Sequence, residues 1–231
     1  MPTPPATAPQ PEPTRPSAPR PTWRGRLHAW AFFCVPPAGL ALLVAAQGAA
    51  ARTAAAIYLV TLAALFGCSA AYHRLATTPR ARRIMRRVDH SMIYLLIAGT
   101  YTPLCLVTLP KAWGLPLLGV VWGGAAAGIT LKLVGFHRFR HAANFLYILL
   151  GWAAVAALPA IVGRLSAAEL ALMVAGGVAY TAGSVILLRR RPDPSPLVFG
   201  YHELWHACTV AAGICHFALV WLLTSSAGSP A

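Results

Sequence analysis

The chain has 231 residues, of which 58% are hydrophobic and only 10% are charged. Because soluble domains carry about 25% charged residues, this composition excludes an ordinary soluble domain. One helical span of a bilayer needs about 20 apolar residues, so the chain has room for roughly six to eight spans and little else. We therefore predict an all-α integral membrane protein.

The formal net charge of +14 would also suit a protein that binds nucleic acid. The basic residues, however, occur in short clusters between apolar segments, as they do in the cytoplasmic loops of membrane proteins. We therefore expect no nucleic-acid partner. The five cysteines lie inside apolar segments without CxxC spacing, which implies no disulfide framework.

Composition divides the chain into two regions. Residues 1–22 are crowded with Pro, Thr and Ala and contain no apolar run, so we predict a disordered cytoplasmic tail. Residues 23–226 are predicted to form one domain of seven transmembrane helices. The apolar segments lie at about 27–47, 54–75, 88–109, 113–133, 142–162, 167–188 and 199–224.

The distribution of cations predicts the topology. Sixteen of the 19 Lys and Arg residues fall in the tail and in the second-to-third, fourth-to-fifth and sixth-to-seventh connections. The other side holds only Arg52, Lys111 and Arg164. The positive-inside rule then places the N-terminus in the cytoplasm and the C-terminus outside. We expect a multi-pass protein of the cell (plasma) membrane.

The last apolar segment opens with FGYHELWH (199–206), in which two histidines stand four residues apart. In a helix such residues lie one above the other on one face, so His202 and His206 can share a ligand. With the predicted topology, His73 ends the second segment and Asp89 begins the third at the same shallow depth on the cytoplasmic side. Ser69 lies one turn deeper than His73 on the same helix face.

Three neutral imidazoles with one open position are typical of a catalytic zinc site, and His73, His202 and His206 fit this pattern. Asp89 is the candidate general base, or a partner that orients an imidazole. Ser69 either hydrogen-bonds a water or substrate oxygen at this site, or bonds back to the carbonyl of residue 65.

The other histidines are expected to lie outside this site. His90 adjoins Asp89 at an angle of about 100° on a helix, so we interpret it as a packing or interfacial residue. His216 lies nearly three turns deeper than the cluster. The remaining three are at span ends, where an interfacial role is expected: His28, His137 and His141.

Residues 202–206 also match HExxH, the zinc-protease signature in which the glutamate is the base. Such proteases need a further ligand, usually downstream, where only His216 remains. His73, Ser69 and Asp89 together account for more of the polar residues. The protease therefore stays an alternative.

Five runs resemble the hemolysin III family, the bacterial branch of the progestin and adiponectin receptor (PAQR) family. They are SAAYH (69–73), DHSMIY (89–94), GTYTP (99–103), GW (151–152) and FGYHELWH (199–206). The resemblance covers about residues 25–224 and does not include the Pro-rich tail. It implies seven helices with the N-terminus inside, zinc on His73, His202 and His206, and Asp89 and Ser69 beside the metal.

The resemblance also implies a relation to membrane ceramidases, within a superfamily of presumed metal-dependent hydrolases. We therefore favour a zinc-dependent hydrolase whose substrate is an amide or ester of a membrane lipid, with Asp89 as the base. One alternative is a receptor or membrane-state sensor in which zinc joins two helices. A cytolytic protein is the other, although the apolar spans show no channel-lining stripe. A metal transporter is disfavoured because the polar groups occupy one depth.

Overall fold

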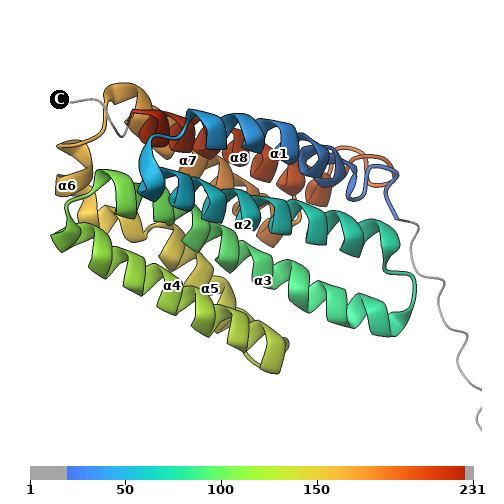
Figure 1. Cartoon of the computed structure of the whole chain (residues 1–231). Helices are drawn as coiled ribbons and strands as arrows, with labels where there is room; N and C mark the ends of the chain where they lie inside the picture. The colour runs from blue at the N-terminus through green and yellow to red at the C-terminus, as the bar shows by residue number, and fades with distance from the viewer. Residues whose placement is uncertain (1–19, 227–231) are drawn as a thin grey trace, which may run out of the picture.

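The structure is a computed structural model of the chain, and residues 20–226 are described. Within these residues, seven helical segments long and apolar enough to cross a membrane form one bundle (Figure 1). The helices are α1 (Arg26–Ala45), α2 (Gly48–Leu75), α3 (Pro79–Pro103), α4 (Lys111–Val134), α5 (Arg140–Gly151), α6 (Leu158–Val162), α7 (Ala167–Arg189) and α8 (Tyr201–Ser225). The prediction of an all-α bundle of seven spans is confirmed.

The third span begins earlier than predicted. The Thr78 side chain accepts a hydrogen bond from the backbone N–H of Ala81 at 3.1 Å, and Pro79 occupies the first helical turn. A capping threonine followed by proline starts a helix efficiently, and arginine is a good helix former. The Arg-rich stretch 80–87, expected in a loop, therefore forms the first turns of α3.

Two spans contain irregular turns. A π-helical turn, η1 (Leu104–Thr108), extends α3 after Pro103. In the fifth span, the 3₁₀ turn η2 (Ala153–Ala157) separates α5 from α6. The Tyr101 hydroxyl donates to the carbonyl of Gly151 at 3.0 Å and accepts from the N–H of Ala154 at 2.8 Å. Tyr101 thus satisfies backbone groups that the interruption frees, as a span in lipid requires.

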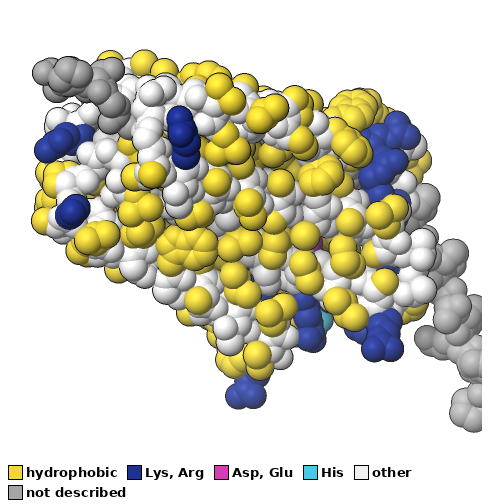
Figure 2. Space-filling view, viewed as in Figure 1, with side chains coloured by type: hydrophobic (Ala, Val, Ile, Leu, Met, Phe, Trp, Pro, Cys, Tyr) yellow, Lys and Arg dark blue, Asp and Glu magenta, His cyan; other side chains and the backbone are white. Residues whose placement is uncertain are grey.

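Apolar side chains cover the length of the bundle in the face shown in Figure 2. Several are largely exposed, including Phe33 at 73%, Val44 at 73% and Leu188 at 79%. Such exposure is costly in water and favourable in a bilayer, where lipid tails take the place of water. The surface therefore agrees with the membrane assignment.

One end of the bundle carries the N-terminal segment, the α2–α3 connection and the α7–α8 loop (Figure 1). We call it the basic end, because these three parts contain Arg20, Arg24, Arg80–Arg87 and Arg189–Arg191. That the basic end faces the cytoplasm remains a prediction. The C-terminal end of α8 lies at the opposite end of the bundle.

Residues 1–19 of the predicted tail lie outside the described residues. Residues 20–25, which we call the N-terminal strap, hydrogen-bond to the bundle. The N–H groups of Thr22 and Trp23 donate to the carbonyls of Leu197 and Val198 at 3.1 and 3.2 Å. A guanidinium nitrogen of Arg20 donates to the carbonyl of His73 at 3.2 Å. Arg20 and Thr22, at the end of the predicted tail, thus bond to the basic end, and the disorder of the tail remains a prediction.

Helices α1, α2 and α8 pack against one another. The Tyr58 hydroxyl on α2 donates to the carbonyl of Gly213 on α8 at 3.4 Å. At the far end, the N–H of Gln47 donates to the carbonyl of Thr224 at 2.9 Å. These contacts align the basic ends of the three helices, where the candidate site lies.

Candidate metal centre

Three imidazoles meet where the last turn of α2 faces the first turns of α8. One ligand nitrogen from each of His73, His202 and His206 lies within 4.8 Å of the others. The Nε2 atoms of His73 and His202 are 3.2 Å apart. Tetrahedral nitrogen ligands about 2.1 Å from zinc stand roughly 3.4 Å apart, so the spacing of this pair suits the ion. The structure thus brings together the three histidines predicted as ligands.

The start of α8 fixes the orientation of His202 and His206. The backbone N–H of Tyr201 donates to Oδ1 of Asp193 at 2.9 Å, and that of Gly200 donates to Oε2 of Glu203 at 2.9 Å. These two carboxylates satisfy N–H groups at the helix N-terminus, which have no partner within the helix. The first turn is therefore regular, and the two imidazoles project from one face.

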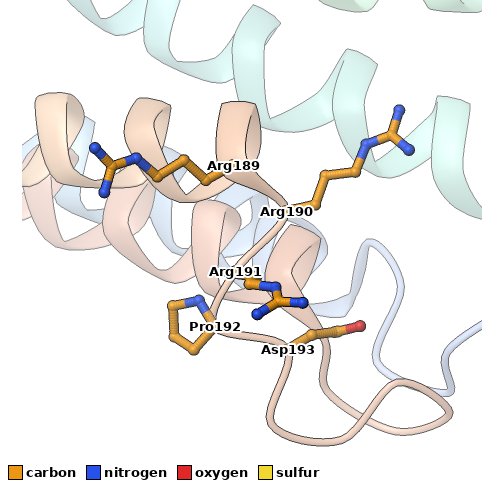
Figure 3. A pocket seen from close by; sticks show the side chains of 5 residues that line it. All are labelled: Arg189, Arg190, Arg191, Pro192 and Asp193. Atoms are coloured by element: carbon orange, nitrogen blue, oxygen red, sulfur yellow. The ribbon is translucent and has the colours of Figure 1, made fainter.

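The loop before α8 contains a hollow lined by Arg189–Asp193. The side chains of Arg189 and Arg190 point in opposite directions (Figure 3). Because these guanidinium groups diverge, we assign no ligand to the hollow. Its role in the site is indirect, through the bond between Asp193 and the first residue of α8.

Ser69 and Asp89 also meet across α2 and α3. Ser69 is 3% exposed, and its side chain interacts with the Asp89 carboxyl group. Within the described residues, the Ser69 hydroxyl makes no bond to the Leu65 carbonyl, the alternative that the sequence left open. Asp89 makes no hydrogen bond to the three imidazoles in this part of the chain, and Ser69, which lies near its carboxyl group, stands one turn before His73.

Glu203 is the glutamate of the HExxH pattern, and both of its oxygens are engaged in other contacts. Oε1 lies 2.5 Å from Nε of Arg24, and Oε2 accepts the bond from Gly200. The side chain is 1% exposed. A protease base must be free to take a proton from water, whereas this carboxylate pairs with a guanidinium and caps a helix. The geometry therefore disfavours the protease interpretation.

His28 was expected to be interfacial, but it lies beside the cluster. It is 3% exposed, and its ring stacks on that of His206 with centroids 3.9 Å apart and planes 12° apart. Only a weak signal in the sequence could have found it, since the place of His28 at the start of the first span does not reveal which helix face is buried. A fourth imidazole thus packs against the candidate metal centre.

Two other histidines lie outside the group of three candidate ligands. His90 lies against the ring of Phe136 at 5.2 Å, as a packing residue would. His216 lies between α7 and α8, with its ring 5.6 Å from that of Tyr180. Neither belongs to the group of imidazoles that could hold a metal ion.

Comparison with known proteins agrees with this arrangement. Residues 17–217 match the family described as "Haemolysin-III related". "Hemolysin-3" of Bacillus cereus is 33% identical over 172 residues, which cover 74% of this chain and 75% of that protein. "Hemolysin-3 homolog" of Bacillus subtilis (strain 168) is 31% identical over 164 residues, covering 71% of this chain and 74% of that protein. The match to the family covers most of this chain, and the described residues form seven helices long and apolar enough to span a membrane. The chain therefore belongs to the haemolysin III family.

Proposed function

We propose that this protein is a zinc-dependent hydrolase that cleaves an amide or ester of a membrane lipid. The observation that supports it most is the meeting of His73, His202 and His206, with ligand nitrogens within 4.8 Å of one another. Three imidazoles from two helices form the protein part of a catalytic zinc site, in which the fourth position stays open. Zinc bound there would lower the pKa of a water molecule to about 7 and polarise a carbonyl oxygen.

Asp89 is the proposed general base. Asp89 is on α3, a helix that supplies none of the three candidate ligands, so as a base it would take a proton from zinc-bound water without giving up a bond to the ion. The Ser69 side chain interacts with this carboxyl group and lies one turn before His73. On this proposal Ser69 is a positioning residue that would orient the Asp89 carboxylate.

The depth of the site favours a lipid substrate. His73 lies two residues before the end of α2, and His202 is the second residue of α8. With a rise of 1.5 Å per residue, the imidazoles lie within about two turns of the basic end. This depth corresponds to the level where headgroups join acyl chains, and where an amide or ester carbonyl is found.

A second candidate function is a membrane-state sensor in which zinc holds helices together. The observation in its favour is that the metal ligands come from the ends of α2 and α8, with His28 of α1 packed on them. A structural ion at this point would set the relative position of three spans. The sensor predicts zinc binding without turnover.

The names of the two Bacillus relatives refer to hemolysis. A lipid hydrolase would account for a hemolytic effect of this chain without a pore, because cleavage of lipids weakens a membrane. On this proposal, hemolysis by the purified protein would require the three histidines. A pore would lyse cells equally well without the metal.

The test is turnover by purified protein in lipid–detergent micelles. Metal-free protein would be compared with zinc-loaded protein on a ceramide-type amide and on a phospholipid ester, with release of fatty acid as the readout. We expect zinc-dependent release that His206→Ala abolishes and His216→Ala retains. Stoichiometric zinc without release from either lipid class would overturn the hydrolase and leave the sensor.

A further inference from the structure

His28 is buried beside the three candidate ligands but is not one of them, so metal binding by those three does not explain why a histidine stands at this position. Both ring nitrogens of His28 are buried, and neither makes a hydrogen bond of normal geometry among the described residues, the nearest polar group being the backbone of His206. An unpaired buried polar group costs about 1–3 kcal/mol, so such groups are rare unless a ligand or water completes them. A phenylalanine would fill the same space without this cost.

The position of His28 points to the metal centre. Its ring lies parallel to that of His206, which is 2% exposed, and the two centroids are 3.9 Å apart. It also lies against the ring of Phe66 of α2, with centroids 5.1 Å apart. His28 therefore holds one face of the His206 ring in a fixed plane, as residues around metal ligands commonly do.

The N-terminal strap fixes where α1, and with it His28, begins. Arg24 pairs with Glu203, and Gly25 adopts the left-handed conformation, with φ of 75°, just before the helix. A side chain at position 25 would meet the β-carbon of His73 at 2.7 Å. The strap thus lies directly against one metal-ligating residue while it anchors the start of α1 to the helix that carries the other two.

We propose that His28 is a positioning residue of the metal centre, with two actions. Its ring holds the His206 imidazole in plane, and a ring nitrogen hydrogen-bonds the molecule that occupies the position left open by His73, His202 and His206. This inference rests on the proposed zinc site, but it holds for the hydrolase and for the sensor alike.

The test uses the full chain in detergent, loaded with Co²⁺ in place of zinc, because the visible spectrum of Co²⁺ reports its ligands. Azide serves as the probe for the open position. His28→Phe keeps a flat ring and removes both nitrogens, whereas His28→Ala removes the ring as well. His216→Phe is the matched control, since Nδ1 of His216 is also buried without a hydrogen-bond partner.

We expect His28→Phe to bind Co²⁺ within about 3-fold of the original protein but to bind azide about 2- to 12-fold more weakly, the range for one lost hydrogen bond. His28→Ala should also weaken Co²⁺ binding, by about 10- to 100-fold, as loss of a ligand-orienting residue does. The control should change neither affinity.

Unchanged azide affinity in His28→Phe would overturn the hydrogen bond, and unchanged Co²⁺ affinity in His28→Ala would overturn the positioning of His206. If His28→Phe aggregates on size-exclusion chromatography, His28→Leu takes its place, with the same expectation for azide. Failure of the original protein to bind Co²⁺ would instead refute the proposed metal site, so the two failures are distinguishable.

Discussion

Nε of Arg24 lies 2.5 Å from Oε1 of Glu203, which joins the N-terminal strap to the first turn of α8 across 179 positions of the sequence. Glu203 is 1% exposed, while the Arg24 side chain keeps 24% of its surface accessible. Glu203 adjoins His202 in sequence, so this ion pair stabilises the part of α8 that carries two of the three candidate metal ligands. Because of this ion pair, the negative charge of the buried Glu203 carboxylate is balanced by the guanidinium of Arg24.

Arg24→Gln should destabilise the fold by about 1–3 kcal/mol, because it leaves the buried Glu203 charge with one backbone hydrogen bond and no cation. The double variant Arg24→Gln/Glu203→Gln should recover part of this loss, because neither side chain is then charged. Unfolding in mixed micelles with rising SDS would measure both. Arg26→Gln is the control, since Arg26 is exposed and should shift stability by less than about 0.5 kcal/mol.

We expect one zinc per chain, held by His73, His202 and His206. Because three imidazoles are the full protein ligand set, replacing any one by Ala should abolish stoichiometric zinc in the purified protein. Elemental analysis after gel filtration measures this, with His216→Ala as the variant that retains the ion. Full retention in His73→Ala would place the third ligand elsewhere. Glu203 is a poor substitute, since both of its oxygens are already bonded.

Asp89→Asn should bind zinc and fold normally while losing turnover by about 10²- to 10⁴-fold, the effect of removing a general base. Glu203→Gln should lower stability but keep turnover per folded molecule within about 3-fold, because its carboxylate holds Arg24 and the start of α8. The zinc protease predicts the opposite order. Assaying both variants on a lipid amide and on a membrane peptide separates these functions, and normal lipid turnover by the Asn variant would make Asp89 structural.

Gly25 and Gly48 both adopt the left-handed backbone conformation, with φ of 75° and 81°, so they can be compared as test and control positions. Alanine at either position should lower the folding stability by about 1 kcal/mol, because a residue with a β-carbon is strained in the left-handed conformation. At Gly25 the new β-carbon would also lie 2.7 Å from that of His73, whereas at Gly48 nothing lies within 4 Å. Gly25→Ala should therefore weaken zinc binding and Gly48→Ala should not, as titration of the metal-free protein with zinc would show. Equal affinities would mean that the strap does not position His73.

The N-terminus should face the cytoplasm and the C-terminus the outside, because 16 of the 19 Lys and Arg residues fall in the tail and in the second-to-third, fourth-to-fifth and sixth-to-seventh connections. A reporter active only outside the membrane should give signal when fused after Ala231 and none when fused at the N-terminus. The reverse pattern of signal would mean that the basic end faces the outside, with the candidate metal centre near the outer surface of the membrane.

The sequence alone determined the seven spans and the three candidate metal ligands. Long apolar segments have few alternatives in a bilayer, because each must satisfy its backbone as a helix. The i, i+4 spacing of His202 and His206 is a local property of one helix, so it could be read without a structure. His73 followed from its place at the end of a span on the same side.

Only the tertiary structure decided which faces of α1, α2 and α8 meet. Periodicity cannot orient α1, since its residues are apolar almost all round, so the burial of His28 on His206 was not foreseeable. Nor did the sequence pair Arg24 with Glu203, because a contact across 179 positions depends on how the bundle closes. The early start of α3 follows from two local signals, Thr78 as cap and Pro79 in the first turn, which prevail over the charge of the Arg-rich stretch that follows.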